Sequence, residues 1–293
     1  MLYDIELRIT QLYVASAAGA RQVARLMPRT MPDEQDVVLA KLDVSPFPDE
    51  RYERPDFFGN LVTEVAYKAA QEKIEFHLHA RVRRLAKPPT LLPSPGPIAL
   101  AAEMAKVRSL AADSPHHFLA PSPRVPVVTQ LVDYSRTVIA RARPTLEAVE
   151  AIGLALHRDL AFDPKATKVD TPMADAFAAR HGVCQDFTHI MIGALRSLGV
   201  PAGYVSGFLR TIPPEGQERL QGADAMHAWV RAWCGPELGW VEYDPTNACF
   251  AGTDHVVIAR GRDYTDVAPV KGVLRTAGMQ AADHAVDVVE VDG

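Results

Sequence analysis

The sequence predicts an α+β protein in which a small antiparallel β region precedes a core of helices packed on an antiparallel sheet. Residues 1–87 alternate apolar and polar side chains with a period of two, which is typical of strands with one solvated face. A proline-rich stretch follows at 88–97. Beyond it, helical periodicity gives way to several short strand-like runs, so helices and strands occupy separate parts of the chain.

The β region is predicted from two alternating runs, "DIELRIT" (4–10) and "KIEFHLHARV" (73–82). In each run, apolar residues occupy one face and polar residues the other. The polar residues are Glu6, Arg8, Thr10, Glu75, His77, His79 and Arg81. This pattern predicts a small antiparallel sheet or sandwich with one wet face.

Helices and then strands are predicted after the linker, whose five prolines in ten residues cannot continue either element. Helix-forming composition or apolar stripes mark 98–112, 128–142 and 145–160, and Thr171-Pro172 opens a short helix. A further helical stripe begins around Cys184 and stops at Gly199. Strand patterns then fit 203–209, 226–233, 239–244 and 255–259.

These elements suggest four parts of the chain. They are a β region (1–87), a proline-rich linker with a helix (88–126), a core (127–275) and a C-terminal strand or tail (276–293).

Composition narrows the function classes. The chain has 293 residues, a net charge of −5 and no prominent basic patch, so we expect no nucleic-acid partner. "RVRRLAK" (81–87) is interpreted as a solvated strand edge. Neither a signal-peptide pattern nor a run of 18 apolar residues occurs, which predicts no signal peptide and no membrane span. Three cysteines in such a chain indicate reduced thiols and a cytoplasmic location.

Cys184 is placed where a thiol becomes acidic. It opens a predicted helix and shares the apolar face with Phe187, so it should lie in a cleft or be buried. A helix N-terminus carries partial positive charge and unpaired N–H groups, which lower a cysteine pKa and can bind an oxyanion. Asp186 in the same turn is interpreted as structural. The alternative is that Cys184 is a small core residue.

A base and an orienting group are predicted on two later strands. "MHAWVRAW" and "GWVEYD" are joined by a Gly- and Pro-containing turn. If a four-residue loop spans 234–237, residue 233 pairs with 238, and His227 then faces Asp244 directly. A one-residue slip would move Asp244 to the other face of the sheet.

The segments "RHGVCQDFTHIMIGALRSLGVPAGYVSGFL", "MHAWVRAW" and "GWVEYDPTN" together resemble the bacterial transglutaminase-like family. The resemblance implies a papain-like transglutaminase core, preceded by the N-terminal β region that accompanies it. It also implies the catalytic order Cys184, His227, Asp244. One departure is Arg8-Ile9-Thr10, where relatives often carry His-x-Thr.

The resemblance implies an enzyme that attacks an amide carbonyl through the Cys184 thiolate, forms a thioester acyl-enzyme and needs no metal or organic cofactor. The partners would be a peptide or protein amide substrate and, for transfer, an amine acceptor. Hydrolysis is favoured because water is always present. The alternatives are an inactive fold that binds proteins or peptides, and a structural zinc site that uses Cys184, Cys234, Cys249 and a histidine. The absence of a Cys-x-x-Cys pair disfavours the zinc site.

Several other residues are candidates for the site or for metal binding. Trp229 and Trp240 are candidates to line the substrate cleft beside His227 or, equally, to pack the core, and the loop 210–225 is a candidate to select substrate. His181 and His189 are interpreted as cap or surface residues. The pairs His77/His79 and His116/His117 have the spacing of metal ligands but are expected to be solvated, so no metal site is predicted.

Overall fold

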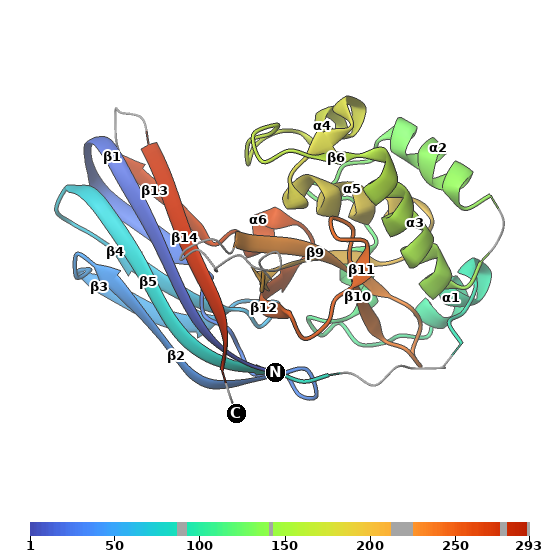
Figure 1. Cartoon of the computed structure of the whole chain (residues 1–293), viewed down its shortest axis with the longest axis horizontal. Helices are drawn as coiled ribbons and strands as arrows, with labels where there is room; N and C mark the ends of the chain where they lie inside the picture. The colour runs from blue at the N-terminus through green and yellow to red at the C-terminus, as the bar shows by residue number, and fades with distance from the viewer. Residues whose placement is uncertain (87–92, 141–142, 212–224, 276–279, 292–293) are drawn as a thin grey trace, which may run out of the picture.

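The computed structural model describes residues 1–86, 93–140, 143–211, 225–275 and 280–291. Figure 1 shows a sheet of long strands on one side of the molecule, most of the helices on the other, and a shorter sheet between them. Both main sheets are antiparallel, so the predicted α+β class is confirmed. Within the described ranges, no helix has both the length and the apolar character needed to cross a membrane.

The N-terminal sheet has the order β2-β5-β1-β4-β3, and β13 and β14 also pair with β1. Its strands are β1 (Leu2–Ala24), β2 (Gln35–Ser45), β3 (Glu50–Pro55), β4 (Leu61–Ala66), β5 (Gln71–Arg84), β13 (Val270–Arg275) and β14 (Gln280–Val291). Early in β1 the neighbours are β5 and β14, and near its end they are β4 and β13. The end of the chain therefore returns to the sheet in which the chain begins.

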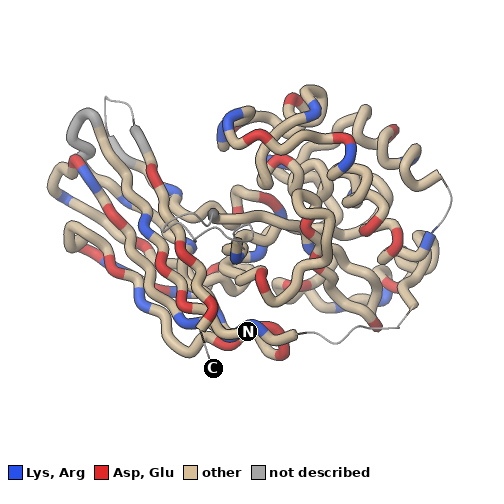
Figure 2. The backbone as a smooth tube through the Cα atoms, viewed as in Figure 1, with Lys and Arg blue, Asp and Glu red and all other residues tan. Residues whose placement is uncertain are grey.

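Alternation decides which face of this sheet is buried. In β1, Tyr3, Ile5 and Leu7 are at most 3% exposed, whereas the polar residues between them are not buried. The predicted wet face is therefore present. Acidic and basic residues are interspersed along its strands (Figure 2).

The rest of the chain forms the helical layer and the central sheet. The helices are α1 (Pro97–Met104), η1 (Pro115–Phe118), α2 (Thr129–Val138), α3 (Thr145–Asp159), α4 (Met173–Ala179), α5 (Cys184–Ser197) and α6 (Tyr264–Val267). The central sheet has the order β11-β10-β9-β8-β12. Its strands are β8 (Ala202–Leu209), β9 (Ala225–Trp233), β10 (Trp240–Asp244), β11 (Cys249–Phe250) and β12 (His255–Gly261). Two short parallel strands, β6 (Ala161–Phe162) and β7 (His181–Gly182), precede α5.

The predicted helix over 98–112 is wrong in its second half, because α1 ends at Met104. Beyond it, the carbonyls of Val107 and Leu110 accept hydrogen bonds from the His116 and His117 rings, at 3.0 and 3.1 Å. A helix continued to residue 112 would need the Val107 carbonyl for the Ala111 N–H, which bonds the Ser109 hydroxyl instead at 3.1 Å. Tertiary contacts therefore override local helix propensity here.

The predicted register of β9 and β10 is wrong by two positions. Arg231 pairs with Glu242, and Cys234 donates its N–H to the Gly239 carbonyl at 2.8 Å. The four-residue turn is thus 235–238 rather than 234–237. Positive φ angles of 96° at Gly235 and 63° at Gly239 allow this turn. A shift of two keeps every side chain on its predicted face, because strand side chains alternate with a period of two.

The N-terminal region covers the β12 edge of the central sheet. The Gln35 side-chain amide donates to the Val257 carbonyl at 2.9 Å and accepts a hydrogen bond from the Val257 backbone N–H at 3.0 Å. Asn60 makes the same pair of bonds to the Arg260 backbone, at 2.9 and 2.8 Å. These amides satisfy backbone groups that an edge strand would otherwise leave unpaired.

Candidate active site

Cys184 is the first residue of α5, as the sequence predicts, and it is partly buried. The apolar face of the helix fixes its orientation, because Phe187, Ile190 and Met191 are at most 1% exposed in the core. The first-turn N–H groups of a helix lack intrahelical partners and carry partial positive charge. The Cys184 sulfur therefore lies at a helix end that favours negative charge.

Asp186 fixes the turn that leads into α5. Its Oδ2 accepts the Val183 N–H at 2.9 Å and the Thr167 hydroxyl at 2.6 Å, and the residue is 1% exposed. A Cβ at Gly182 would lie 2.6 Å from the same oxygen, so the close approach requires glycine. These contacts support the structural role predicted for Asp186.

His227 and Asp244 are in contact, but diagonally rather than directly opposite. His227 Nε2 lies 2.7 Å from Asp244 Oδ2. Continuing the observed register places Asp244 opposite Trp229, one pair away from His227 on the same face. Diagonal neighbours in a sheet are within reach of long side chains. Because Nε2 meets the carboxylate, Nδ1 is the imidazole nitrogen left for a second partner.

The Asp244 carboxylate is fully buried and accepts several hydrogen bonds. Oδ1 accepts the backbone N–H groups of Thr246 and Asn247, at 2.9 and 3.2 Å. Oδ2 also accepts the Asn247 side-chain amide at 2.7 Å and contacts His255 Nε2 at 3.2 Å. A buried carboxylate without such partners would be strongly unfavourable, so these bonds hold it ionised.

The pKa values of the pair move in opposite directions. Burial lowers the pKa of His227, but hydrogen bonds to Asp244 and Cys184, together with the charges of both groups, outweigh burial and raise it. Burial raises the pKa of Asp244, but hydrogen bonds from His227 and His255 outweigh that effect and lower it. The arrangement therefore stabilises a charged imidazolium between a carboxylate and the Cys184 thiol.

A second buried layer supports His227. Trp229 has no exposed surface, lies with its ring centroid 6.2 Å from that of His227, and donates Nε1–H to Glu242 at 2.8 Å. Arg260, on β12, forms ion pairs with Glu242 of β10 and with Glu34 of the N-terminal region. His227 therefore lies beside a tryptophan that is hydrogen-bonded to a charge cluster joining both parts of the chain.

The other sequence candidates have different placements. Because Trp229 is fully buried, it packs behind His227 rather than facing a substrate. Trp240 lies beside Phe118 and Arg231, with the Arg231 guanidinium carbon 4.0 Å from its ring centroid, and is not next to His227. Residues 212–224, most of the loop proposed to select substrate, lie outside the described ranges.

His189 is buried, which corrects its expected cap or surface position. It is 4% exposed, and its Nε2 accepts the Tyr264 N–H at 3.2 Å. Burial lowers its pKa to about 4. A neutral, occupied imidazole at this position does not compete with His227 for the role of base.

Sequence reasoning missed His255 and Asn247. The only available signals were a histidine that opens the otherwise apolar run "HVVIA" and an asparagine that follows "DPT". His227, Asp244 and His255 also have donor atoms within 4.8 Å of one another, which is close enough to hold a metal ion. A metal there would occupy the nitrogen and oxygen that orient the imidazole.

Comparisons with known proteins identify the family to which the chain belongs. Residues 132–245 match the model of the transglutaminase-like superfamily, and residues 3–83 match the bacterial transglutaminase-like N-terminal region. The crystal structure of a Cytophaga hutchinsonii protein, named provisionally as a cysteine protease, is similar with a TM-score of 0.75 at 20% identity. The alignment covers 100% of this chain and 91% of that one.

Two mycobacterial relatives are similar over most of their length. An uncharacterized protein of Mycobacterium tuberculosis is 30% identical over 263 residues, which is 88% of this chain and 83% of the relative. One from Mycobacterium leprae is 30% identical over 284 residues, covering 96% and 95%. The chain therefore belongs to the bacterial transglutaminase-like family, in which a transglutaminase-like core follows its own N-terminal β region.

Proposed function

We propose that the protein is a cysteine-dependent enzyme that breaks amide bonds in peptides or proteins, with Cys184 as nucleophile, His227 as acid and base, and Asp244 as orienting group. One observation carries this proposal. A fully buried carboxylate holds Nε2 of an imidazole, and the Cys184 sulfur at the start of α5 lies near enough to the same imidazole to raise its pKa. A nucleophile, its base and the group that orients the base are thus grouped in one site.

The proposed reaction has two stages. His227 takes the Cys184 thiol proton, and the sulfur attacks the amide carbonyl carbon while N–H groups at the start of α5 bind the oxygen. The C–N bond then breaks, the imidazolium gives its proton to the leaving amine, and a thioester remains. In the second stage, water or an amine attacks the thioester with His227 as base, which releases the thiol.

The acceptor decides whether the enzyme is a hydrolase or an acyltransferase. We propose hydrolysis as the main activity, because water needs no binding site whereas an amine does. Transfer to an amine would use the same acyl-enzyme. Both outcomes require Cys184. One assay series, run with and without an added amine, therefore tests the nucleophile and separates hydrolysis from transfer.

The test uses glutamine-containing peptides and casein, with and without a fluorescent primary amine. Ammonia release, peptide cleavage and amine incorporation are measured for wild type, Cys184→Ala and the matched control Cys249→Ser. Cys249 is an exposed thiol on β11, whereas Cys234 is fully buried and burial raises its pKa to about 12. We expect Cys184→Ala to abolish every activity and Cys249→Ser to keep it.

Alkylation of the native protein gives an independent check. Iodoacetamide followed by peptide mapping should modify Cys184 fastest at pH 6, and His227→Ala should slow that reaction. An inert Cys184, together with no turnover of any substrate, would contradict the proposal. It would leave a transglutaminase-like fold that only binds proteins or peptides.

A further inference from the structure

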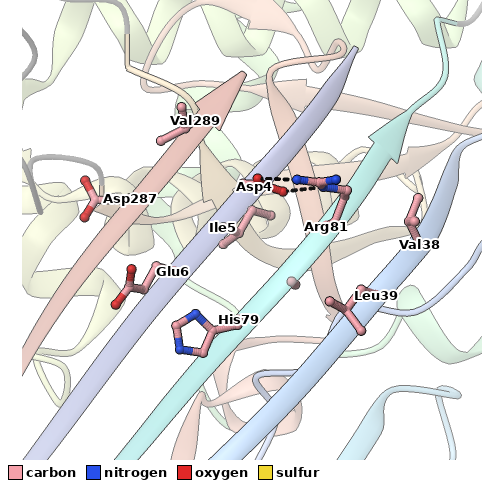
Figure 3. A pocket seen from close by; sticks show the side chains of 10 residues that line it. Asp4, Ile5, Glu6, Val38, Leu39, His79, Arg81, Asp287 and Val289 are labelled. Carbon is pink, nitrogen blue, oxygen red and sulfur yellow. Dashed lines mark hydrogen bonds and ion pairs between the residues drawn. The ribbon is translucent and has the colours of Figure 1, made fainter. Parts of the chain in front are cut away.

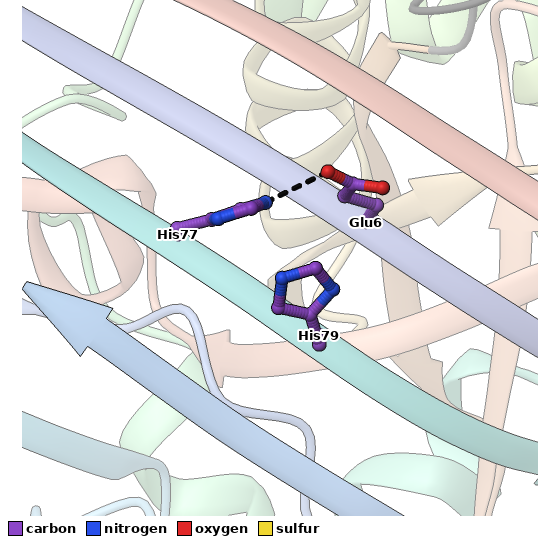
Figure 4. A group of neighbouring side chains, drawn as sticks. All are labelled: Glu6, His77 and His79. Atoms are coloured by element: carbon purple, nitrogen blue, oxygen red, sulfur yellow. Dashed lines mark hydrogen bonds and ion pairs between the residues drawn. The ribbon is translucent and has the colours of Figure 1, made fainter.

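Two histidines and a glutamate meet on the wet face of the N-terminal sheet, far in sequence from the Cys184 site. Figure 4 shows His77 and His79 on β5 beside Glu6 on β1. His77 Nε2 lies 2.8 Å from Glu6 Oε1, and the two imidazole centroids are 4.0 Å apart. One donor atom from each residue lies within 4.8 Å of the other two.

Strand pairing brings these side chains together. Glu6 is paired with His79 across β1 and β5, and His77 is the next residue on the same face of β5. Alternate residues of a strand point to the same side, so both imidazoles and the carboxylate project from one surface. The His-x-His spacing gives two nitrogen donors, and the register supplies an oxygen donor that the sequence pattern alone does not indicate.

We propose that Glu6, His77 and His79 form a binding site for one divalent transition-metal ion, with Zn²⁺ as the expected ion. Imidazole nitrogen and carboxylate oxygen are ligands of zinc, and sites with three protein ligands take water in the fourth position. Two imidazoles and one carboxylate also exclude Mg²⁺ and Ca²⁺ as preferred ions, because those ions favour oxygen ligands.

The distances require only a small rearrangement. Ligand atoms about 2.0–2.2 Å from a tetrahedral zinc lie roughly 3.4 Å apart. His77 Nε2 and Glu6 Oε1 now lie 2.8 Å apart and all three donor atoms lie within 4.8 Å of one another, so shifts of about an ångström are enough. The side chains of His77 and Glu6 are 28% and 45% exposed and can rotate without disturbing the core. Among the described residues, His79 makes no hydrogen bond that metal binding would break.

The surroundings permit access and set the strength of binding. A hollow of about 780 Å³ lies against His79 and Glu6 (Figure 3), and another of about 350 Å³ lies against His77. Asp287 on β14 lies opposite Glu6 in the strand pairing, and Asp43 on β2 lies opposite His77. These carboxylates favour a cation and can supply a fourth ligand.

Two cations reduce the affinity. Arg8 is paired with His77, and Lys41, which bonds Asp43 at 2.8 Å, is paired with His79. An exposed site with cations nearby should bind zinc more weakly than a closed structural site does. We therefore expect reversible binding by the folded protein, with a modest rise in its thermal stability.

The experiment titrates the full-length, metal-free protein with Zn²⁺ alone by isothermal calorimetry and with Co²⁺ by visible absorption. The variants are His77→Ala, His79→Ala and Glu6→Gln. His116→Ala/His117→Ala is the matched control, because it removes an adjacent histidine pair whose rings bond backbone carbonyls. Asp244→Asn reports any binding at the His227, Asp244 and His255 group.

We expect one zinc ion to be lost, or bound at least tenfold more weakly, in each histidine variant. Removal of a residue that only supports a ligand already costs about 10–100-fold in metal affinity. Glu6→Gln should weaken binding less, and the His116/His117 variant should bind like the wild type. Unchanged binding in His77→Ala and His79→Ala, loss of binding in Asp244→Asn instead, or no binding by the wild type would each overturn the proposal. Circular dichroism of the metal-free variants checks that they are folded.

Discussion

Replacing Asp244 by asparagine should change the tautomer of His227, so that the proton of the neutral imidazole moves from Nε2 to Nδ1. In the wild type, Oδ1 accepts the backbone N–H groups of Thr246 and Asn247, so Oδ2 faces the imidazole. In Asp244→Asn the amide oxygen should keep these two donors, because backbone N–H groups cannot turn away, whereas the Asn247 side-chain amide that donates to Oδ2 can flip to present its oxygen. The amide nitrogen then points at Nε2, which becomes an acceptor, and the imidazole proton moves to Nδ1.

The size of the effect follows from the bond that is lost. A hydrogen bond to a charged group contributes about 1.5–3 kcal/mol, and one pKa unit corresponds to about 1.36 kcal/mol. The pKa of His227 should therefore fall by about 1–2 units in Asp244→Asn. Relative to the neutral thiol–imidazole pair, the ion pair of the Cys184 thiolate with the imidazolium becomes about 10–100-fold less favourable, and the Nδ1 proton hinders removal of the thiol proton.

The assay is the rate of Cys184 alkylation by iodoacetamide between pH 5 and pH 9, followed by mass spectrometry. At pH 6 we expect Asp244→Asn to react at least about tenfold more slowly than the wild type, and the two rates should converge at high pH. Asp175→Asn is the matched control, because it removes the same charge from an exposed position of α4. A folded Asp244→Asn protein that reacts at the wild-type rate at pH 6 would refute the reasoning.

Three further predictions concern stability. Gly182→Ala should lower the free energy of unfolding by about 1–3 kcal/mol, because the new Cβ would crowd Asp186; an unchanged urea midpoint would contradict this. Arg260→Met should cost about 3–5 kcal/mol, since it removes a cation from the buried Glu242; thermal unfolding measures the loss, and an equal Tm would argue against it. Burial raises the pKa of Glu242, but Arg260 and the Trp229 hydrogen bond outweigh burial and hold it at about 2. A carboxyl group whose pKa is lowered by folding stabilises the fold at any pH above its pKa in the unfolded chain. This stabilisation is lost as the pH falls through the pKa of the folded protein, so stability should drop from about pH 4.5 towards pH 2. Glu242→Gln should flatten that drop, and an equally steep curve would count against the assignment.

Local pattern determined much of the fold. The alternation in "DIELRIT" and "KIEFHLHARV" identified two strands and their wet face, because only one face of such a strand is buried. The apolar stripe from Phe187 placed Cys184 at the start of a helix, and alternation also put His227 and Asp244 on one face. Each of these features depends on residues that are close in sequence.

The tertiary structure decided register and partners. The turn at 235–238 moved the β9–β10 pairing by two, so the orienting contact between His227 and Asp244 is diagonal. The sheet face on which a side chain lies follows from the period of two in the sequence. The pairing register of two strands depends on turn geometry and packing, which short-range patterns do not encode.

Contacts between distant segments were likewise decided by the fold. His255 reaches Asp244 although β9 and β8 lie between β10 and β12 in the sheet order, and Glu6 meets His77 only because β1 pairs with β5, 71 residues further along the chain. The sequence by itself determined the chemical groups and the face of each strand on which they lie. The tertiary structure decided which of them meet, because long-range pairing is set by the packing of the whole chain.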